Sequence, residues 1–282
     1  MKTTTAHCLV KNEARYVWFS VMSVIKYVDR VLLWDTGSTD NTIEIIEEIL
    51  KTPEGREKVE FKKCDPVTPE TFTKVRQEML DATNTDWFLM VDGDEAWFDD
   101  SIKKVVDTIQ EKGDKLESIV VPTINLIGDI YHYQEEAGGN YELAGKRGHF
   151  NLRGVNRKIP GLKSFGPHGK WGWADSTGKM IEKRAARKIA FVDAPYLHAT
   201  HLQRSGEFKK EGDVPKRKMK LKYELGIPFP KDYFYPEVLF RDKPDSVPSP
   251  WVKMTPEFKR RAAIETPLKK LKRRIFKSGV GY

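Results

Sequence analysis

Residues 87–95 read WFLMVDGDE, five apolar residues followed at once by three carboxylates around a glycine. Such an apolar run is typical of a strand buried on both faces, as in a parallel sheet. In extended backbone, side chains two positions apart point to the same side, so Asp92 and Asp94 can present oxygens to one divalent ion. Gly93 lets a phosphate or the metal approach the backbone closely. The stretch predicts a buried strand that ends in a metal-binding turn, and the buried strand argues against a merely solvated acidic turn.

Strand-like and helix-like segments alternate on both sides of this stretch. Apolar patterns predict strands at 4–10, 30–34, 59–63, 87–91 and 118–122, with helices after Asn12, after the turn that ends at Asp40, and at 69–82 and 102–111. This alternation predicts an α/β fold, a mostly parallel sheet with helices on both faces. Ligands bind such sheets beyond the carboxyl ends of the strands, which places Lys11, Asn12, Glu13, Asp35 and residues 92–95 along one edge.

A second turn of interest reads DTGSTDNT, residues 35–42. Gly37 permits a tight turn after a strand, and Ser38, Thr39 or Asp40 can cap the next helix. The Asp35 carboxylate can accept hydrogen bonds from a base or a ribose. The alternative is a strand-to-helix turn that binds nothing.

The second half of the chain is less regular. Glycine, aromatic and basic residues dominate 127–172, a further strand is expected at 187–192, and two histidines, His198 and His201, follow it. A basic segment with a proline-rich stretch comes next. We therefore predict one domain over 1–205, with a nucleotide-binding half at 1–126 and an acceptor-side half at 127–205, and a basic extension over 206–282.

The extension is expected to end in an amphipathic helix. Thr266 and Pro267 can open it, with Leu268, Leu271 and Ile275 on one face and basic residues on the rest. A helix of this composition can lie on an anionic membrane. The alternatives are a solvated helix packed on its own domain and a disordered tail.

Three motifs in order resemble the family 2 glycosyltransferases: CLVKNE at 8–13, RVLLWDTGSTDNT at 30–42, and Arg76 followed by DWFLMVDGDE at 86–95. The match covers roughly the first 100 residues, and within the family the chain is most similar to bacterial enzymes of cell-surface polysaccharide and lipopolysaccharide-core assembly. The resemblance implies a GT-A fold, a nucleotide-sugar donor (UDP-sugars are the commonest), a glycan or lipid-linked acceptor, and Mn²⁺ or Mg²⁺.

The resemblance also implies roles for single residues. Arg76 would lie near the donor diphosphate, Asp92 near the sugar or ribose and the metal, and Asp94 would be the more direct metal ligand. A histidine would complete the metal site, either His198, which we favour, or His201. The residues implied to line the nucleotide pocket are Val10, Asn12, Glu13 and Asp35.

Family 2 enzymes mostly invert the anomeric centre, which requires one carboxylate base near the acceptor hydroxyl. Asp175 is the predicted base, with Glu182 and Asp193 as alternatives. Trp171 and Trp173 can stack on acceptor sugar rings, or they can be core residues.

Composition limits the function more loosely. The formal charge of +8 favours anionic partners, and the two cysteines, Cys8 and Cys64, are expected to be reduced thiols. Neither a signal peptide nor a run of eighteen apolar residues is found, so we expect a cytoplasmic protein, peripheral on the inner face of the membrane at most.

Three other functions were weighed. A nucleotidyltransferase needs a glycine-rich phosphate loop after the first strand, where this chain has LVKNEAR. A nucleic-acid-binding protein is disfavoured, because basic and aromatic residues are not interleaved and no recognised motif is found. A GT-A-like protein that has lost its activity stays an alternative, although Asp92 and Asp94 are intact.

Overall fold

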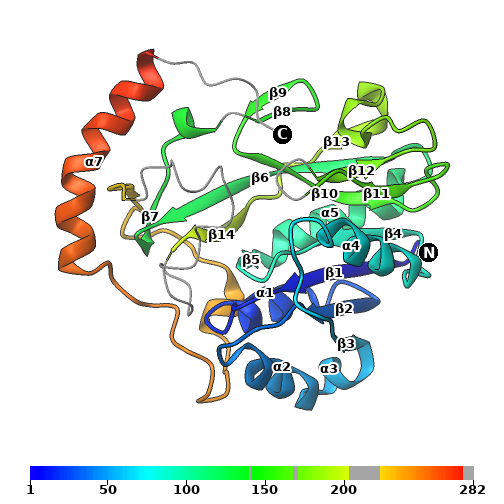
Figure 1. Cartoon of the computed structure of the whole chain (residues 1–282), viewed down its shortest axis with the longest axis horizontal. Coiled ribbons are helices and arrows are strands. Elements are labelled where there is room, and N and C mark those ends of the chain that lie inside the picture. The colour runs from blue at the N-terminus through cyan, green and yellow to red at the C-terminus, as the bar shows by residue number, and fades with distance from the viewer. Residues whose placement is uncertain (140, 168–170, 203–222, 276–282) are drawn as a thin grey trace.

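The computed structural model describes residues 1–139, 141–167, 171–202 and 223–275 (Figure 1). Its centre is a mixed sheet in the order β15-β7-β6-β10-β4-β1-β2-β3. The path consists of β1 (Thr4–Val10), β2 (Arg30–Asp35), β3 (Val59–Lys63), β4 (Trp87–Met90), β6 (Ser118–Ile127), β7 (Asp129–Tyr133), β10 (Phe150–Asn156) and β15 (Ile227–Pro228). Shorter strands are β5 (Glu95–Trp97), β8 (Tyr141–Leu143), β9 (Lys146–Gly148), β11 (Lys163–Phe165), β12 (Gly172–Ala174), β13 (Ile189–Phe191) and β14 (Tyr196–His201).

Helices cover both faces of the parallel part of this sheet, as predicted. Ala6, Cys8 and Leu33 point to one face, where they share a core with the apolar sides of α1, α2 and α5. Leu32 and Trp34, one position out of phase, point to the opposite face and pack against α4. The helices are α1 (Val17–Val24), α2 (Thr42–Lys51), α3 (Pro53–Lys58), α4 (Phe72–Asp81), α5 (Asp99–Lys112) and α7 (Pro256–Ile275).

The predicted strands of the N-terminal half are confirmed, and those at 4–10 and 59–63 match to the residue. One detail is wrong: Asn12 does not cap the first helix, which begins at Val17. Asn12 has a left-handed φ of 57°, and its Oδ1 accepts a hydrogen bond from the Thr39 amide at 2.7 Å. The residue thus joins the turn after β1 to the turn after β2.

The stretch 127–172, whose weak periodicity predicted irregular structure, contains a central strand. β10 lies between β4 and β6 and runs antiparallel to both. Its register shifts between Leu152 and Gly154, so Arg153 is the extra residue of a β-bulge. A bulge breaks the alternation of side chains and re-aims one of them, which explains both the missing pattern and the buried position of Arg153.

His198 lies within a strand, whereas the sequence suggested a segment after the last strand. β14 pairs with β5, where His198 lies opposite Glu95, and with β6, where it lies opposite Asn125. The strand predicted at 187–192 is the shorter β13. β14, through its pairing with β5, brings residues late in the chain back to the segment that follows β4.

The C-terminal helix is longer than predicted. α7 begins at Pro256, and Pro267 lies inside it rather than at its start. The proposed boundary at 205/206 and the basic segment after it lie outside the described residues. No described helix is long and apolar enough to span a membrane.

Candidate active site

Backbone and side-chain hydrogen bonds bring the carboxyl ends of β1 and β2 together. The Val10 carbonyl accepts hydrogen bonds from the Thr36 amide at 2.9 Å and from its hydroxyl at 3.0 Å, and the Asn12 amide donates to Ser38 Oγ at 2.8 Å. Asp35 Oδ2 accepts hydrogen bonds from the Gly37 and Ser38 amides, both at 3.0 Å. The four residues predicted to line a nucleotide pocket, Val10, Asn12, Glu13 and Asp35, therefore lie along one edge of the sheet.

Gly93 joins this edge to the end of β4. A Cβ at Gly93 would lie 2.7 Å from Val10 Cγ1 and 3.0 Å from Glu13 Cγ. We expect Gly93→Ala to lower the free energy of unfolding by about 1–3 kcal/mol through overpacking. Urea unfolding measures this loss. The same substitution is also made in a Val10→Ala variant, in which the methyl group that would clash is absent. If Gly93→Ala costs the same in both backgrounds, the clash is not the cause.

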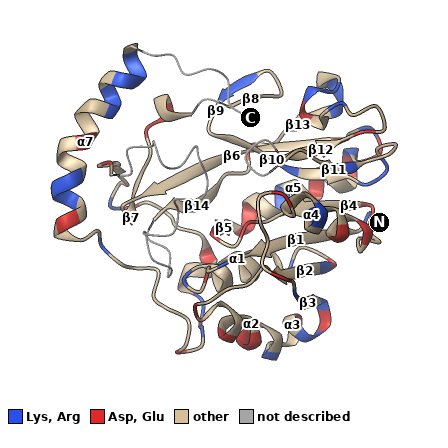
Figure 2. Cartoon of the chain, viewed as in Figure 1, with Lys and Arg blue, Asp and Glu red and all other residues tan. Residues whose placement is uncertain are grey.

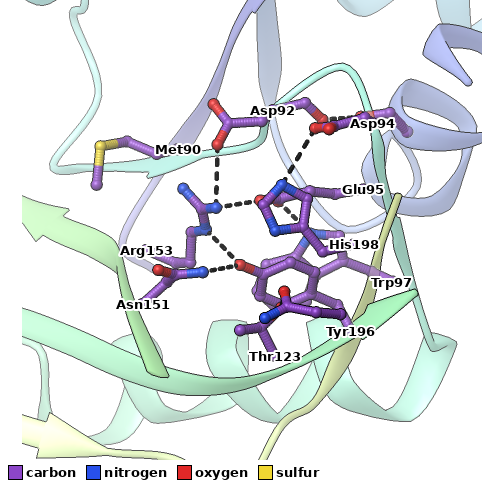
Figure 3. Close-up of polar contacts among 12 residues, drawn as sticks. Met90, Asp92, Asp94, Glu95, Trp97, Thr123, Asn151, Arg153, Tyr196 and His198 are labelled. Carbon is purple, nitrogen blue, oxygen red and sulfur yellow. Dashed lines mark hydrogen bonds and ion pairs between the residues drawn. The ribbon is translucent and has the colours of Figure 1, made fainter. Parts of the chain in front are cut away.

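Two arginines from distant segments hold the Asp92 carboxylate, and Figure 3 shows one of them, Arg153. Arg153 Nη2 donates to Oδ2 at 3.0 Å, and Arg76 Nη2 donates to Oδ1 at 3.4 Å. Burial alone would raise the pKa of Asp92, but Arg153 and Arg76 outweigh it, and the pKa is lower than usual. Arg153 also forms an ion pair with the buried Glu95, whose pKa burial raises to about 8.

Asp94 and His198 meet across the same site. The distance from His198 Nε2 to Asp94 Oδ1 is 3.3 Å. Burial alone would lower the pKa of His198, but the Asp94 carboxylate, by its charge and its hydrogen bond, raises the pKa above the usual value. His198, the histidine predicted to complete a metal site, thus lies in β14 beside Asp94.

The side chains that meet at this site could bind a divalent cation. Asp92, Glu95 and His198 each offer one ligand atom, and these atoms lie within 4.8 Å of one another. Asp94 is not one of these three residues, but its carboxylate contacts His198. Carboxylate oxygens and one imidazole suit Mn²⁺ and Mg²⁺. Asp92, Asp94 and His198 were predicted from the sequence as metal ligands, and the structure adds Glu95, the residue that follows Asp94, to the residues that meet there.

Arg76 is buried beside this cluster with unused donors. Its side chain stacks on Phe72 and Trp171, with guanidinium-to-ring distances of 5.3 and 5.1 Å. Within the described part of the chain, Nε and Nη1 are buried and have no hydrogen-bond partner. Such orphaned charged donors are costly unless a ligand satisfies them. The position of Arg76 next to Asp92 suits an anionic group of a bound ligand.

Arg153 itself and the two residues that support it, Tyr196 and Asn151, were missed by sequence reasoning (Figure 3). The Tyr196 hydroxyl accepts hydrogen bonds from Arg153 Nε at 3.0 Å and from Asn151 at 2.6 Å. The Tyr196 ring stacks on Trp97 at a centroid distance of 4.6 Å. Only Glu95 carried a sequence signal, since it directly follows the predicted metal motif. Arg153, Asn151 and Tyr196 lie in segments without a recognisable pattern.

Asp175, the predicted base, lies outside this network. Its Oδ1 accepts hydrogen bonds from the Thr177 hydroxyl and amide and from the Lys179 amide, and it forms an ion pair with Arg184. The Thr177 hydroxyl is the main reason that the pKa of Asp175 is lower than usual. These contacts suit a residue that closes a turn, and a carboxylate of low pKa is a weak base. Its surroundings do not support the predicted role.

The other residues predicted from the sequence lie in different surroundings. Trp173 is a core residue that packs edge-on against Phe88, so its ring is not available to stack on a sugar. Trp171 is half-buried, and its ring packs against the Arg76 guanidinium. Glu182 is half-buried, and Asp193 is exposed between β13 and β14. His201 ends β14 opposite Ile127, three residues beyond the histidine that contacts Asp94.

Comparison with known structures gives distant likenesses. The chain is similar to Staphylococcus aureus TarS residues 1–349 in complex with UDP-GlcNAc (14% identity, 73% of this chain and 60% of that chain, TM-score 0.48). It is also similar to glucosyl-3-phosphoglycerate synthase from Mycobacterium tuberculosis in complex with Mn²⁺, UDP and glucosyl-3-phosphoglycerate (17% identity, 70% of this chain and 72% of that chain, TM-score 0.45). The chain spans 37% of a longer TarS structure. No curated protein matches it.

The sequence itself gives the assignment. The family model described as glycosyl transferase family 2 matches residues 8–173, more than half of the chain. The matched region includes the turns after β1 and β2, the DGDE motif and Arg153. With a parallel N-terminal sheet and its polar cluster at the carboxyl edge, the chain has an α/β fold of the GT-A type and belongs to glycosyl transferase family 2.

Proposed function

We propose that this protein is a glycosyltransferase that moves a hexosyl group from a nucleotide-sugar donor to a saccharide or lipid-linked acceptor. The observation that carries the proposal is the convergence of Asp92, Glu95 and His198 on one point at the carboxyl edge of the sheet. A Mn²⁺ or Mg²⁺ ion bound there would neutralise the charge that develops on the diphosphate. Arg76, with its unused buried donors, supplies the place for a phosphate oxygen.

The reaction needs one displacement. The acceptor hydroxyl oxygen bonds to the anomeric carbon, the bond from that carbon to the diphosphate oxygen breaks, and the hydroxyl proton passes to a carboxylate. Such a displacement inverts the anomeric centre. Asp175, Glu182 and Asp193 remain the sequence-based predictions for that carboxylate.

The experiment is donor binding by calorimetry across UDP-, GDP- and dTDP-sugars, with Mn²⁺ or with EDTA. We expect one donor class, UDP-sugars first, to bind only with Mn²⁺. No binding of any donor by the folded protein would contradict the proposal and favour a family member that has lost its activity.

Arg76→Met tests the diphosphate contact. Since a hydrogen bond to a charged group contributes about 1.5–3 kcal/mol, the variant should bind the donor roughly 10- to 100-fold more weakly while still binding Mn²⁺. Arg30→Met is the matched control, because Arg30 begins β2 at the opposite edge of the sheet and pairs with Glu60. Equal losses in the two variants would show that Arg76 does not meet the donor.

A further inference from the structure

The helix α7 presents its apolar side away from the protein. Its large apolar residues are exposed: Ile264 by 71%, Leu268 by 55%, Leu271 by 54% and Ile275 by 61%. Their spacing of four, three and four residues places them on one side of an α-helix. Among the described residues none buries this side. We define these four residues as the apolar stripe.

The opposite side of α7 is bound to the rest of the chain mainly by polar contacts. Arg273 forms ion pairs with Glu135 at 2.7 Å and Glu224 at 2.6 Å, and Lys269 lies 3.5 Å from the same Glu224. Thr266 Oγ1 accepts a hydrogen bond from the Leu225 amide at 2.7 Å. An ordinary surface helix buries its apolar side and exposes its charges. In α7 this arrangement is reversed, so the orientation leaves the apolar stripe available to a partner.

Basic side chains border the apolar stripe. On a helical projection of 100° per residue, Arg260 and Arg274 fall on one side of it and Arg261 and Lys272 on the other. All four are exposed, and Figure 2 shows the Lys and Arg bands along α7. An exposed apolar line between two basic borders matches the boundary between acyl chains and anionic headgroups.

The same borders disfavour a second copy as the partner. Two stripes packed together would bring the basic borders of both copies close to one another, where like charges repel. A nucleic acid would use the charges but leave the apolar residues exposed. We propose that α7 docks this protein on an anionic lipid surface, with the apolar stripe in the interface. The inference does not depend on the sugar-transfer activity.

The location of α7 suits this role. β10 runs antiparallel to both β4 and β6, so β6 and β4 are parallel and end at the same edge. Gly128, which follows β6, lies against Phe258 of α7: a Cβ there would be 2.7 Å from the ring. The helix continues along the outer side of the molecule beside β7 (Figure 1). The proposed docking helix therefore begins at the edge of the sheet that carries the DGDE turn.

The test is co-sedimentation of the full chain with vesicles of phosphatidylcholine alone or with phosphatidylserine added. We expect binding only to the anionic vesicles, weakened by high salt. Lys272→Glu/Arg274→Glu should lower the partition coefficient about 30-fold or more, since each basic residue near such a surface contributes about 1 kcal/mol. The matched control with the same change in charge is Lys104→Glu/Lys115→Glu, at exposed positions away from α7.

A second pair of variants tests the apolar contribution. Leu268→Ser/Leu271→Ser keeps the charge and should lower binding at least about tenfold. Phe240→Ser/Val252→Ser, which removes exposed apolar residues elsewhere (65% and 45% exposed), should bind as the parent does. Unchanged binding by the first pair would mean attraction by charge alone and would overturn the proposal. So would a dimer that Leu268→Ser/Leu271→Ser dissociates, or no binding to anionic vesicles.

Discussion

Asp94→Ala is expected to abolish Mn²⁺-dependent donor binding and to lower the transfer or donor-hydrolysis rate by more than about 100-fold. The substitution removes the carboxylate that contacts His198 at 3.3 Å and leaves a half-buried imidazole without this partner. Donor binding by calorimetry, with and without Mn²⁺, and the rate of donor hydrolysis are the measurements. Asp107→Ala, on the exposed side of α5, is the control and should behave like the parent.

The same experiment distinguishes the two histidines. His198→Ala should lose Mn²⁺ affinity as Asp94→Ala does, whereas His201→Ala should retain it. The physical reason is the position in β14, where His198 lies opposite Glu95 and His201 lies opposite Ile127. Should His201→Ala lose the metal while His198→Ala keeps it, the assignment of the site in this structure is wrong.

Arg153→Met is expected to give the largest loss of stability of any single change at the site. Glu95 is 1% exposed, and within the described part of the chain it forms an ion pair with Arg153. Above about pH 8, where Glu95 is ionised, removing one partner of this buried pair leaves an uncompensated charge and costs about 3–5 kcal/mol. Urea unfolding without metal measures this loss. In the Glu95→Gln background, where no charge is left behind, the cost of Arg153→Met should be clearly smaller.

The pH dependence of this loss has a definite sign. Burial already raises the pKa of Glu95 to about 8 in the presence of Arg153, and removal of the arginine raises it further. The folded variant then holds a proton that the unfolded chain releases above the usual glutamate pKa. Because Glu95 of the parent also keeps its proton up to about pH 8, the stability of the variant relative to the parent is constant at lower pH and falls as the pH rises above about 8. A pH-independent loss would assign the effect to packing around Tyr196 instead.

Much of the N-terminal half could be predicted from the sequence. β2 and β4 contain continuous apolar runs, VLLW and WFLM, and the alternation of the strands with amphipathic helices leaves few other folds. The same reasoning placed Asn12, Asp35 and the DGDE turn at one edge, because parallel strands end together. The helix start was less accurate: α1 begins at Val17 because Asn12 adopts a left-handed conformation and bonds to the next turn.

The second half could not be predicted in the same way. β10 carries a bulge at Arg153, so its buried and polar positions do not alternate and no periodic signal remains. Asp175 was predicted as the base because it lies after the DGDE motif, in the half expected to hold the acceptor, but its oxygens contact Thr177, Lys179 and Arg184. The helix α7 was predicted to be amphipathic, yet its orientation depends on ion pairs to Glu135 and Glu224, far away in sequence.

The sequence by itself thus determined the parallel half of the sheet, the family and the edge at which the polar residues gather, because these depend on local patterns of apolar and turn residues. Only the tertiary structure decided which cation meets which carboxylate. Arg153 reaches Asp92 and Glu95 through a bulge in an antiparallel strand, and His198 reaches Asp94 through a strand that returns to the end of β4. Contacts between segments so far apart depend on how the strands pack together, which local patterns do not encode.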